Sequence, residues 1–270
     1  MLIVALVICL VQADRLENDL NIVLGSGLRL ETPGTLVIGG AEAPMYKYTY
    51  TSGMRRNANG ASFCGGTLVA PKYIITAAHC ANSIQYVSVG SHYRSGRSDG
   101  VQVPVARVIQ HPNYNRPYMA NDIAIVELTT EIQDTNWIAY LGVNEPSIGA
   151  VATLHGWGRV AYPGDGSEVL KEIDLPIVSP SECQTNLGSA VGVQIHESMI
   201  CAGGKLNQAA CHGDSGGPLV LYKDASPPVL IGAVSWGKPC GTGRPDAYAR
   251  ISHFKSFIDQ YVTGHTWVNV

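Results

Sequence analysis

Residues 211–219 read CHGDSGGPL and place one serine, one aspartate and three glycines in a short stretch. Glycine is favoured where the backbone must turn sharply or pass close to another group. The stretch therefore predicts a tight turn that presents Ser215 to its surroundings. A serine hydroxyl is a weak nucleophile until a neighbouring base accepts its proton. If Ser215 is to react, the rest of the chain must supply a histidine and a carboxylate.

Two other positions offer these partners. His79 lies in TAAHC, after a β-like run and next to Cys80, and Asp122 opens the stretch DIAIVEL. Histidine is the usual base because its pKa lies near neutrality, and an acid can fix its tautomer. Taken alone, a histidine is more often structural, and an aspartate before a strand is more often a turn residue. His79 and Asp122 therefore indicate catalysis only in combination with Ser215.

The order His79, Asp122, Ser215 is one of the known chain orders of a catalytic triad. Further motifs surround the three residues. In chain order these are VIGG at 37–40, CGGTLVAPKYIITAAHC at 64–80, NDIAIVEL at 121–128, GWG at 156–158, GDSGGPL at 213–219, SWG at 235–237 and Pro-x-x-Tyr at 245–248. With these motifs the chain resembles the chymotrypsin/trypsin-like family of serine endopeptidases over most of its length.

The pattern of the chain after Val37 indicates an all-β fold. Short β-branched runs recur between glycines, prolines and asparagines, and no helices alternate with them. The resemblance implies two antiparallel Greek-key β-barrels, at about 37–145 and 146–250, with the catalytic groups in the cleft between them. Apolar residues at helical spacing predict one C-terminal helix at about 252–262, which Ser252 would cap.

The start of the chain predicts processing. The apolar run from Leu2 to Val11 is too short to span a bilayer and is typical of a signal peptide, which we assign to residues 1–13. A buried N-terminal strand is the alternative. Residues 14–36 are weakly patterned and read as a pro-segment, so the protease domain is expected at 37–270. We therefore expect a secreted, extracellular protein.

Composition and cysteines agree with that location. The chain is 46% hydrophobic and 14% charged with a net charge of −3, which does not favour nucleic acid or anionic membranes as partners. Cys9 falls in the predicted signal peptide, and the even number that remains suggests disulfides whose pairing the sequence alone leaves open. The resemblance implies Cys64–Cys80, Cys183–Cys201 and Cys211–Cys240.

The resemblance also assigns roles near Ser215. The backbone N–H groups of Gly213 and Ser215 would form the oxyanion hole. Cleavage before Val37 would free an ammonium that pairs with Asp214, which makes an activating protease a partner. Such precursors are usually cut after arginine or lysine, whereas Leu36 stands here. Either a protease of another specificity activates the chain, or it is not activated in the usual way.

The specificity pocket departs from the trypsin pattern. Ala209 and then Ala210 stand where trypsin-like members carry an aspartate at the pocket floor, and Asp246 stands where most members carry glycine. The carboxylate of Asp246 would accept arginine or lysine by charge-assisted hydrogen bonds, or would narrow the pocket instead. We expect basic or broad preference. The other substrate-binding residues implied by the resemblance are Ser235, Trp236 and Gly237.

No cofactor is expected. In the loop VGSHYRSGRSDG, where some trypsin-like members bind calcium through glutamates, Ser91 replaces the first glutamate and only Asp99 is acidic. We therefore expect no metal, a protein or peptide substrate, and a monomer.

Two other functions compete with the endopeptidase. Some relatives of this fold have lost catalysis and act as binding or inhibitor proteins, but they usually lack a triad residue. An esterase is the third reading, because Gly213 to Gly217 approximates its G-x-S-x-G elbow. The helices of an α/β-hydrolase are not predicted here.

Overall fold

The computed structural model describes residues 39–161, 163–189, 192–223 and 227–270. The predicted signal peptide 1–13, the pro-segment 14–36 and Val37 lie outside the described residues, so those expectations stay predictions.

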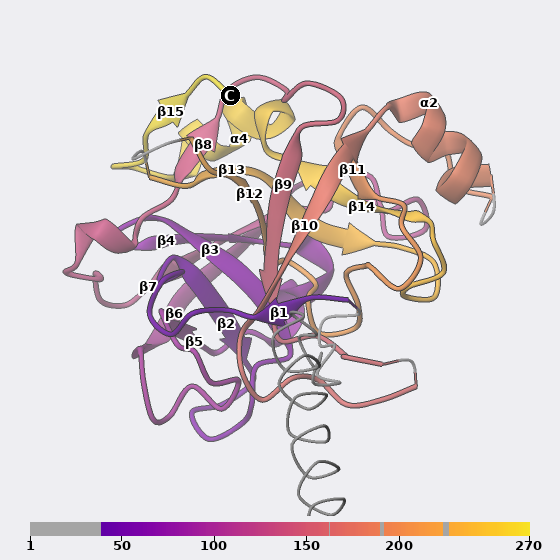
Figure 1. The fold of residues 1–270 in the computed structure, drawn as a ribbon. Coiled ribbons are helices and arrows are strands. Elements are labelled where there is room, and N and C mark those ends of the chain that lie inside the picture. The colour runs from indigo at the N-terminus through magenta and orange to yellow at the C-terminus, as the bar shows by residue number, and fades with distance from the viewer. Residues whose placement is uncertain (1–38, 162, 190–191, 224–226) are drawn as a thin grey trace, which may run out of the picture. The chain divides into compact units, whose positions relative to one another are not determined.

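Six strands close the first barrel, which Figure 1 shows in indigo and magenta. Their order is β2-β3-β4-β7-β6-β5, and β2 pairs with β5 to complete the ring. The bounds are β2 Thr51–Arg55, β3 Cys64–Ala70, β4 Tyr73–Thr76, β5 Tyr86–Val89, β6 Val101–Gln110 and β7 Ala124–Leu128. Met54, Leu68, Ile74, Val87 and Val126 fill its interior, as the alternation of β-branched and other apolar residues requires.

Six antiparallel strands of the C-terminal half close the second barrel, in rose to yellow in Figure 1. The order is β12-β9-β10-β11-β14-β13, and β12 also pairs with β13. The bounds are β9 Val151–Gly156, β10 Lys171–Val178, β11 Met199–Gly203, β12 Pro218–Leu221, β13 Val229–Trp236 and β14 Pro245–Arg250. The prediction of an all-β fold with two antiparallel barrels is confirmed.

Three short strands extend the second sheet beyond its barrel. Strand β1 (Ala41–Glu42) pairs antiparallel with β10. Strand β8 (Tyr140–Gly142) lies parallel to β13, and β15 (Trp267–Val268) lies parallel to β8. The pattern of turn signals did not predict the two parallel pairings.

The C-terminal helix starts later than predicted. Residues Ile251–Phe254 form a 3-10 turn, η4, and the α-helix α4 spans Lys255–Tyr261. Ser252 lies inside η4 and does not cap α4, so the predicted cap is wrong. Phe257 and Ile258 of α4 are buried in the larger core cluster, as the helical spacing predicted. The remaining 3-10 turn outside the site is η2, Thr135–Trp137.

One helical segment was not predicted. Helix α2 (Pro180–Cys183) continues into a π-helical turn, Gln184–Gly188. Ser179 accepts a hydrogen bond from the amide of Glu182, and Pro180 occupies the first turn, a standard helix start. Cys183 then joins Cys201, one of three disulfides with Cys64–Cys80 and Cys211–Cys240. These are the pairs that the family resemblance implies.

Candidate active site

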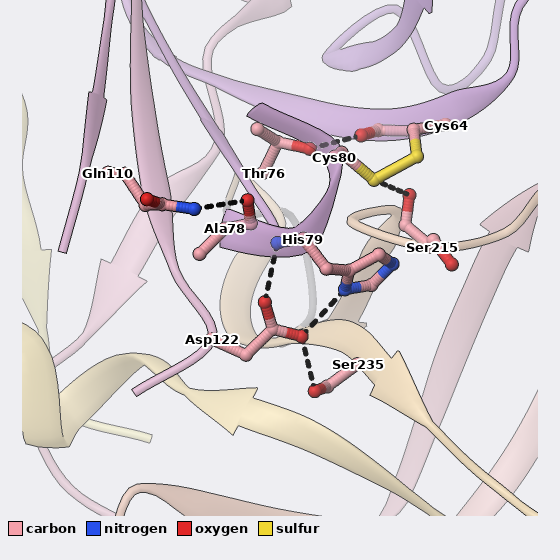
Figure 2. Close-up of a disulfide and its surroundings, with 10 residues drawn as sticks. Cys64, Thr76, Ala78, His79, Cys80, Gln110, Asp122, Ser215 and Ser235 are labelled. Atoms are coloured by element: carbon pink, nitrogen blue, oxygen red, sulfur yellow. Dashed lines mark hydrogen bonds and ion pairs between the residues drawn. A yellow bond between two sulfur atoms is a disulfide. The ribbon is translucent and has the colours of Figure 1, made fainter. Parts of the chain in front are cut away.

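His79 lies in the 3-10 turn η1 (Ala78–Ser83), directly after β4. Its neighbour Cys80 is bonded to Cys64 at the start of β3, and the carbonyl of Ala78 accepts a hydrogen bond of 2.8 Å from Gln110 of β6. The backbone that carries His79 is thus fixed to two strands of the first barrel (Figure 2).

Asp122 is the buried partner of His79. Its Oδ2 lies 2.8 Å from Nδ1 of His79, and its Oδ1 accepts the backbone N–H of His79 at 2.9 Å. Oδ2 also accepts the hydroxyl of Ser235 from β13 at 2.5 Å. Because three donors surround a carboxylate that is 2% exposed, the imidazole ring has one defined orientation.

The backbone on either side of Asp122 explains its position. Asn121 adopts φ 56°, a left-handed conformation that asparagine tolerates better than most residues. Its backbone N–H donates to the hydroxyl of Ser198, the residue before β11 of the second barrel, at 3.1 Å. This turn directs Asp122 toward His79 just before β7 begins.

Ser215 faces the other side of the His79 ring. Figure 2 shows the imidazole lying between Asp122 and Ser215. The turn is tied to both barrels: the carbonyl of Ser215 accepts the amide of Gly65 in β3 at 2.7 Å, and the amide of Gly216 donates to Val234 of β13 at 2.7 Å. Gly216 has φ +77°, and a side chain there would lie 2.6 Å from the carbonyl oxygen of Gly65. The predicted tight turn therefore requires glycine.

Two free amides lie in this turn. Among the described residues, no acceptor is bonded to the backbone N–H of Gly213 or of Ser215. Gly213 has φ +105°, and a Cβ there would lie 3.1 Å from the Cα of Gly158. The positive φ and the close approach to Gly158 both require glycine at this position.

The side chain of Asp214 points inward, away from the surface. It is buried, and its two oxygens accept the amides of Gly158 at 2.8 Å and Cys211 at 2.9 Å. A side chain at Gly156 would overlap its carboxylate. Burial raises the pKa of Asp214 to about 6, although the two amide hydrogen bonds act in the opposite direction. Its predicted partner, Val37, lies outside the described residues.

A cavity of about 390 Å³ opens beside Ser215. It is lined by segments on both sides of the Cys211–Cys240 disulfide and by β13 and β14. The lining residues are Ala210, Cys211, His212, Ser215, Val234, Ser235, Trp236, Gly237, Lys238, Pro239, Cys240 and Asp246. All predicted substrate-binding residues are among them except Ala209, which is buried beside the cavity without lining it.

Asp246 brings a buried carboxyl group into this cavity. Its Oδ2 accepts the amide of Ala210 at 2.9 Å, and a Cβ added to Gly237 would lie 2.1 Å from its Oδ1. Burial raises the pKa of Asp246 to about 8, the amide of Ala210 opposes the rise, and the charge of Asp214 adds to it. The side chain thus enters the cavity from β14 and packs against Gly237.

Two features were missed by sequence reasoning. Ser235 was predicted only as a pocket residue, yet it also donates to Asp122. Lys238 and Pro239 also line the cavity, and their position next to the SWG motif was the available signal.

In the loop 89–100, where we expect no calcium, Asp99 accepts a hydrogen bond from the hydroxyl of Ser91 at 2.5 Å and one from the backbone N–H of His92 at 2.6 Å.

The comparison with known families shows to which family the chain belongs. A family model described as Trypsin matches residues 37–258. The chain belongs to the trypsin family. This trypsin-family chain is 34% identical over 240 residues to glucanase inhibitor protein 3 of Phytophthora infestans, covering 85% of the chain and 89% of that relative. It is also 34% identical to trypsin eta of Drosophila erecta over 249 residues, with 87% and 93% covered.

Another relative of this trypsin-family chain is trypsin delta of Drosophila melanogaster, 34% identical over 231 residues with 82% and 87% covered. The names of the relatives thus include both trypsins and an inhibitor of another enzyme. Among the described residues, no helix has the length and apolar character needed to cross a membrane.

Proposed function

We propose that the chain is a serine endopeptidase that hydrolyses peptide bonds through an acyl-enzyme on Ser215. The observation that supports this most is the arrangement of His79 between Asp122 and Ser215, with Asp122 held by three hydrogen bonds. A binding protein that used only the surface of this fold would not require an imidazole held in one orientation.

The proposed reaction follows from these positions. His79 accepts the proton of the Ser215 hydroxyl as the oxygen attacks the substrate carbonyl. The negative oxygen that forms is stabilised by the free amides of Gly213 and Ser215. His79 then returns the proton to the leaving amine, and water releases the acyl group by the same steps in reverse. Asp122 stabilises the charged imidazole throughout and stays ionised.

We propose a basic or broad preference at the residue before the cleaved bond. The carboxyl group of Asp246 lines the cavity next to Ser215, and it packs against Gly237, where a side chain would collide with it. An arginine or lysine side chain entering this cavity would meet one buried acceptor, and charge-assisted hydrogen bonds are the strong ones. Because Asp246 enters from the side, the cavity also has room for uncharged side chains.

Secretion and activation belong to the same proposal. Three disulfides are typical of chains that fold in oxidising compartments, which agrees with the predicted signal peptide. An activating protease would cut between Leu36 and Val37, and the new ammonium would neutralise the buried Asp214. Each barrel closes without a second copy, so we propose a monomer.

A catalytically silent binding or inhibitor protein is the second candidate. The relative named glucanase inhibitor protein 3 has the same identity, 34%, as trypsin eta. Sequence identity to these relatives therefore does not distinguish the two functions. The reactivity of Ser215 has to distinguish them.

The test is to produce the protein with Val37 as its first residue and to measure covalent labelling by an organophosphate together with cleavage of a peptide library. We expect labelling of Ser215 and cleavage, and Ser215→Ala should abolish both while unfolding at the same denaturant concentration. A folded protein that neither labels nor cleaves would refute the endopeptidase and leave the binding protein.

A further inference from the structure

We propose that Lys238 recognises a carboxylate of the substrate close to the peptide bond that Ser215 attacks. This makes Lys238 a specificity-determining residue and narrows the substrate class to peptides with an acidic group near the cleavage site. The inference rests on the proposed function, and the experiment below separates the two.

Lys238 lies at the same cavity as Ser215 and is held there by its neighbours. It follows the end of β13 by two residues, and Pro239 limits its backbone to extended conformations. Cys240 is bonded to Cys211, with their Cα atoms 5.4 Å apart, and Cys211 precedes Ser215 in the same turn. The backbone of Lys238 is therefore held at a fixed place relative to Ser215, and only its side chain has to be ordered when a ligand binds.

The ammonium group of Lys238 has no partner among the described residues, although the residue is half-buried. Most other lysines are engaged. Lys72 pairs with Glu127, Lys171 with Glu42 and Lys255 with Asp259, Lys223 donates to the carbonyl of Asn269, and Lys47 lies over the ring of Tyr48. Lys205 is also unpaired, but it is exposed and does not line the cavity. Lys238 thus combines an unused positive charge with a place on the lining of the cavity that Ser215 also lines.

The cavity presents an acidic group and a basic group at different places. The carboxyl group of Asp246 is bonded to the amide of Ala210 and makes no ion pair with Lys238. A peptide that satisfies both groups offers a basic side chain to Asp246 and a negative group to Lys238. Amide and hydroxyl groups would not neutralise the ammonium, so a carboxylate is the complementary group. Its source is an aspartate or glutamate side chain or the free C-terminus of a short peptide.

Binding to the Ser215→Ala protein starting at Val37 tests the proposal without turnover. Fluorescent peptides share one arginine and differ by glutamate or glutamine at each position on either side of it, with amidated or free C-termini. At one position we expect glutamate to bind about 3- to 10-fold tighter than glutamine at low ionic strength, and less so in salt. A preference seen only for free C-termini supports carboxylate recognition and assigns it to the terminal group.

The substitutions identify the residue. Lys238→Gln should abolish the glutamate preference, Lys238→Glu should reverse it, and Lys238→Arg should retain it. Lys205→Gln, the other unpaired lysine, is the matched control and should change nothing. The proposal is overturned if glutamate is favoured at no position, or if the preference survives in Lys238→Gln. Organophosphate labelling of the protein with Ser215 intact judges the proposed endopeptidase separately, because the binding measurement does not depend on catalysis.

Discussion

In the proposed function, substrate preference depends most on the carboxyl group of Asp246. With a pKa raised to about 8 by burial, it is mostly protonated near pH 7 while the cavity is empty. The other ionisable groups around it are Asp214, whose charge raises the pKa further, Tyr248 on the same strand, and His212 and Lys238 on the lining of the cavity. An entering guanidinium favours the charged form, so binding of a basic side chain and loss of a proton are coupled.

This coupling predicts a pH-dependent preference. The ratio of kcat/KM for an arginine substrate to that for a matched glutamine substrate should rise with pH and level off above about 8. Below that pH the ratio should fall roughly tenfold per unit, because kcat/KM reports the free enzyme and the ionised fraction falls by that factor. Since the ratio is taken between two substrates, ionisations that affect both substrates equally cancel.

Asp246→Asn is the control for this prediction. It keeps an acceptor for the amide of Ala210 but cannot ionise, so its ratio should be low and flat with pH. The raised pKa of Asp246 also means that the folded protein loses stability as pH rises from about 4 to about 8. The asparagine variant should lack that loss in denaturant unfolding. A wild-type ratio that does not change with pH would show that Asp246 does not set the preference.

At the scale of elements, the Cys211–Cys240 disulfide joins the Ser215 turn to the segment after β13. Replacing both cysteines by alanine should cost about 3–4 kcal/mol of the free energy of unfolding, since the bond closes a loop with a sequence separation of 29. It should also weaken the preference for arginine, because Lys238, Pro239 and Cys240 line the cavity and would no longer be fixed. Denaturant unfolding and a peptide library measure the two effects.

The Cys183–Cys201 disulfide is the matched control. Its sequence separation is 18, so its removal should cost a similar free energy, about 3 kcal/mol. Neither cysteine lines the cavity, and the preference for arginine should therefore survive. If both double variants lose the preference equally, the effect reports loss of global stability and not the loosening of the cavity wall.

The elements also show where sequence patterns suffice. Buried strands such as β3 and β13 were predictable because short apolar runs with β-branched residues, placed between turn residues, favour strands. Helix α2 was missed because four residues are too few for a helical period to be visible, although Ser179 and Pro180 marked its start. The parallel pairings of β8 depend on contacts between distant segments, which no local pattern records.

At the scale of the whole molecule, the candidate site depends on the meeting of the two barrels. His79 and Asp122 come from the first barrel and Ser215 from the second, an arrangement that the family resemblance, carried by the motifs around these residues, implied. The third donor to Asp122, Ser235, could not be predicted, because only the folded chain brings the end of β13 within hydrogen-bond distance of Asp122. The same holds for the bond between Asp246 and the amide of Ala210.

The proposed activation makes a prediction about the whole chain. Asp214 is buried with a pKa raised to about 6, so its charge destabilises the folded protein as pH rises from about 4 to 6. Cleavage before Val37 frees an ammonium whose ordinary pKa is about 8. Between pH 6 and 8 both groups are charged, and their pairing should make the cleaved protein more stable than the uncleaved protein by roughly 2–3 kcal/mol.

Denaturant unfolding across pH measures this difference. The gap between cleaved and uncleaved protein should shrink below pH 6, where Asp214 becomes protonated, and above about pH 8, where the ammonium loses its proton. Asp214→Asn should remove the gap at every pH, because it keeps the shape of the side chain without its charge. It should also suppress organophosphate labelling of the cleaved protein if the pair orders the turn that holds Ser215. A gap that is constant with pH, or that persists in Asp214→Asn, would mean that Asp214 is not the group that responds to cleavage.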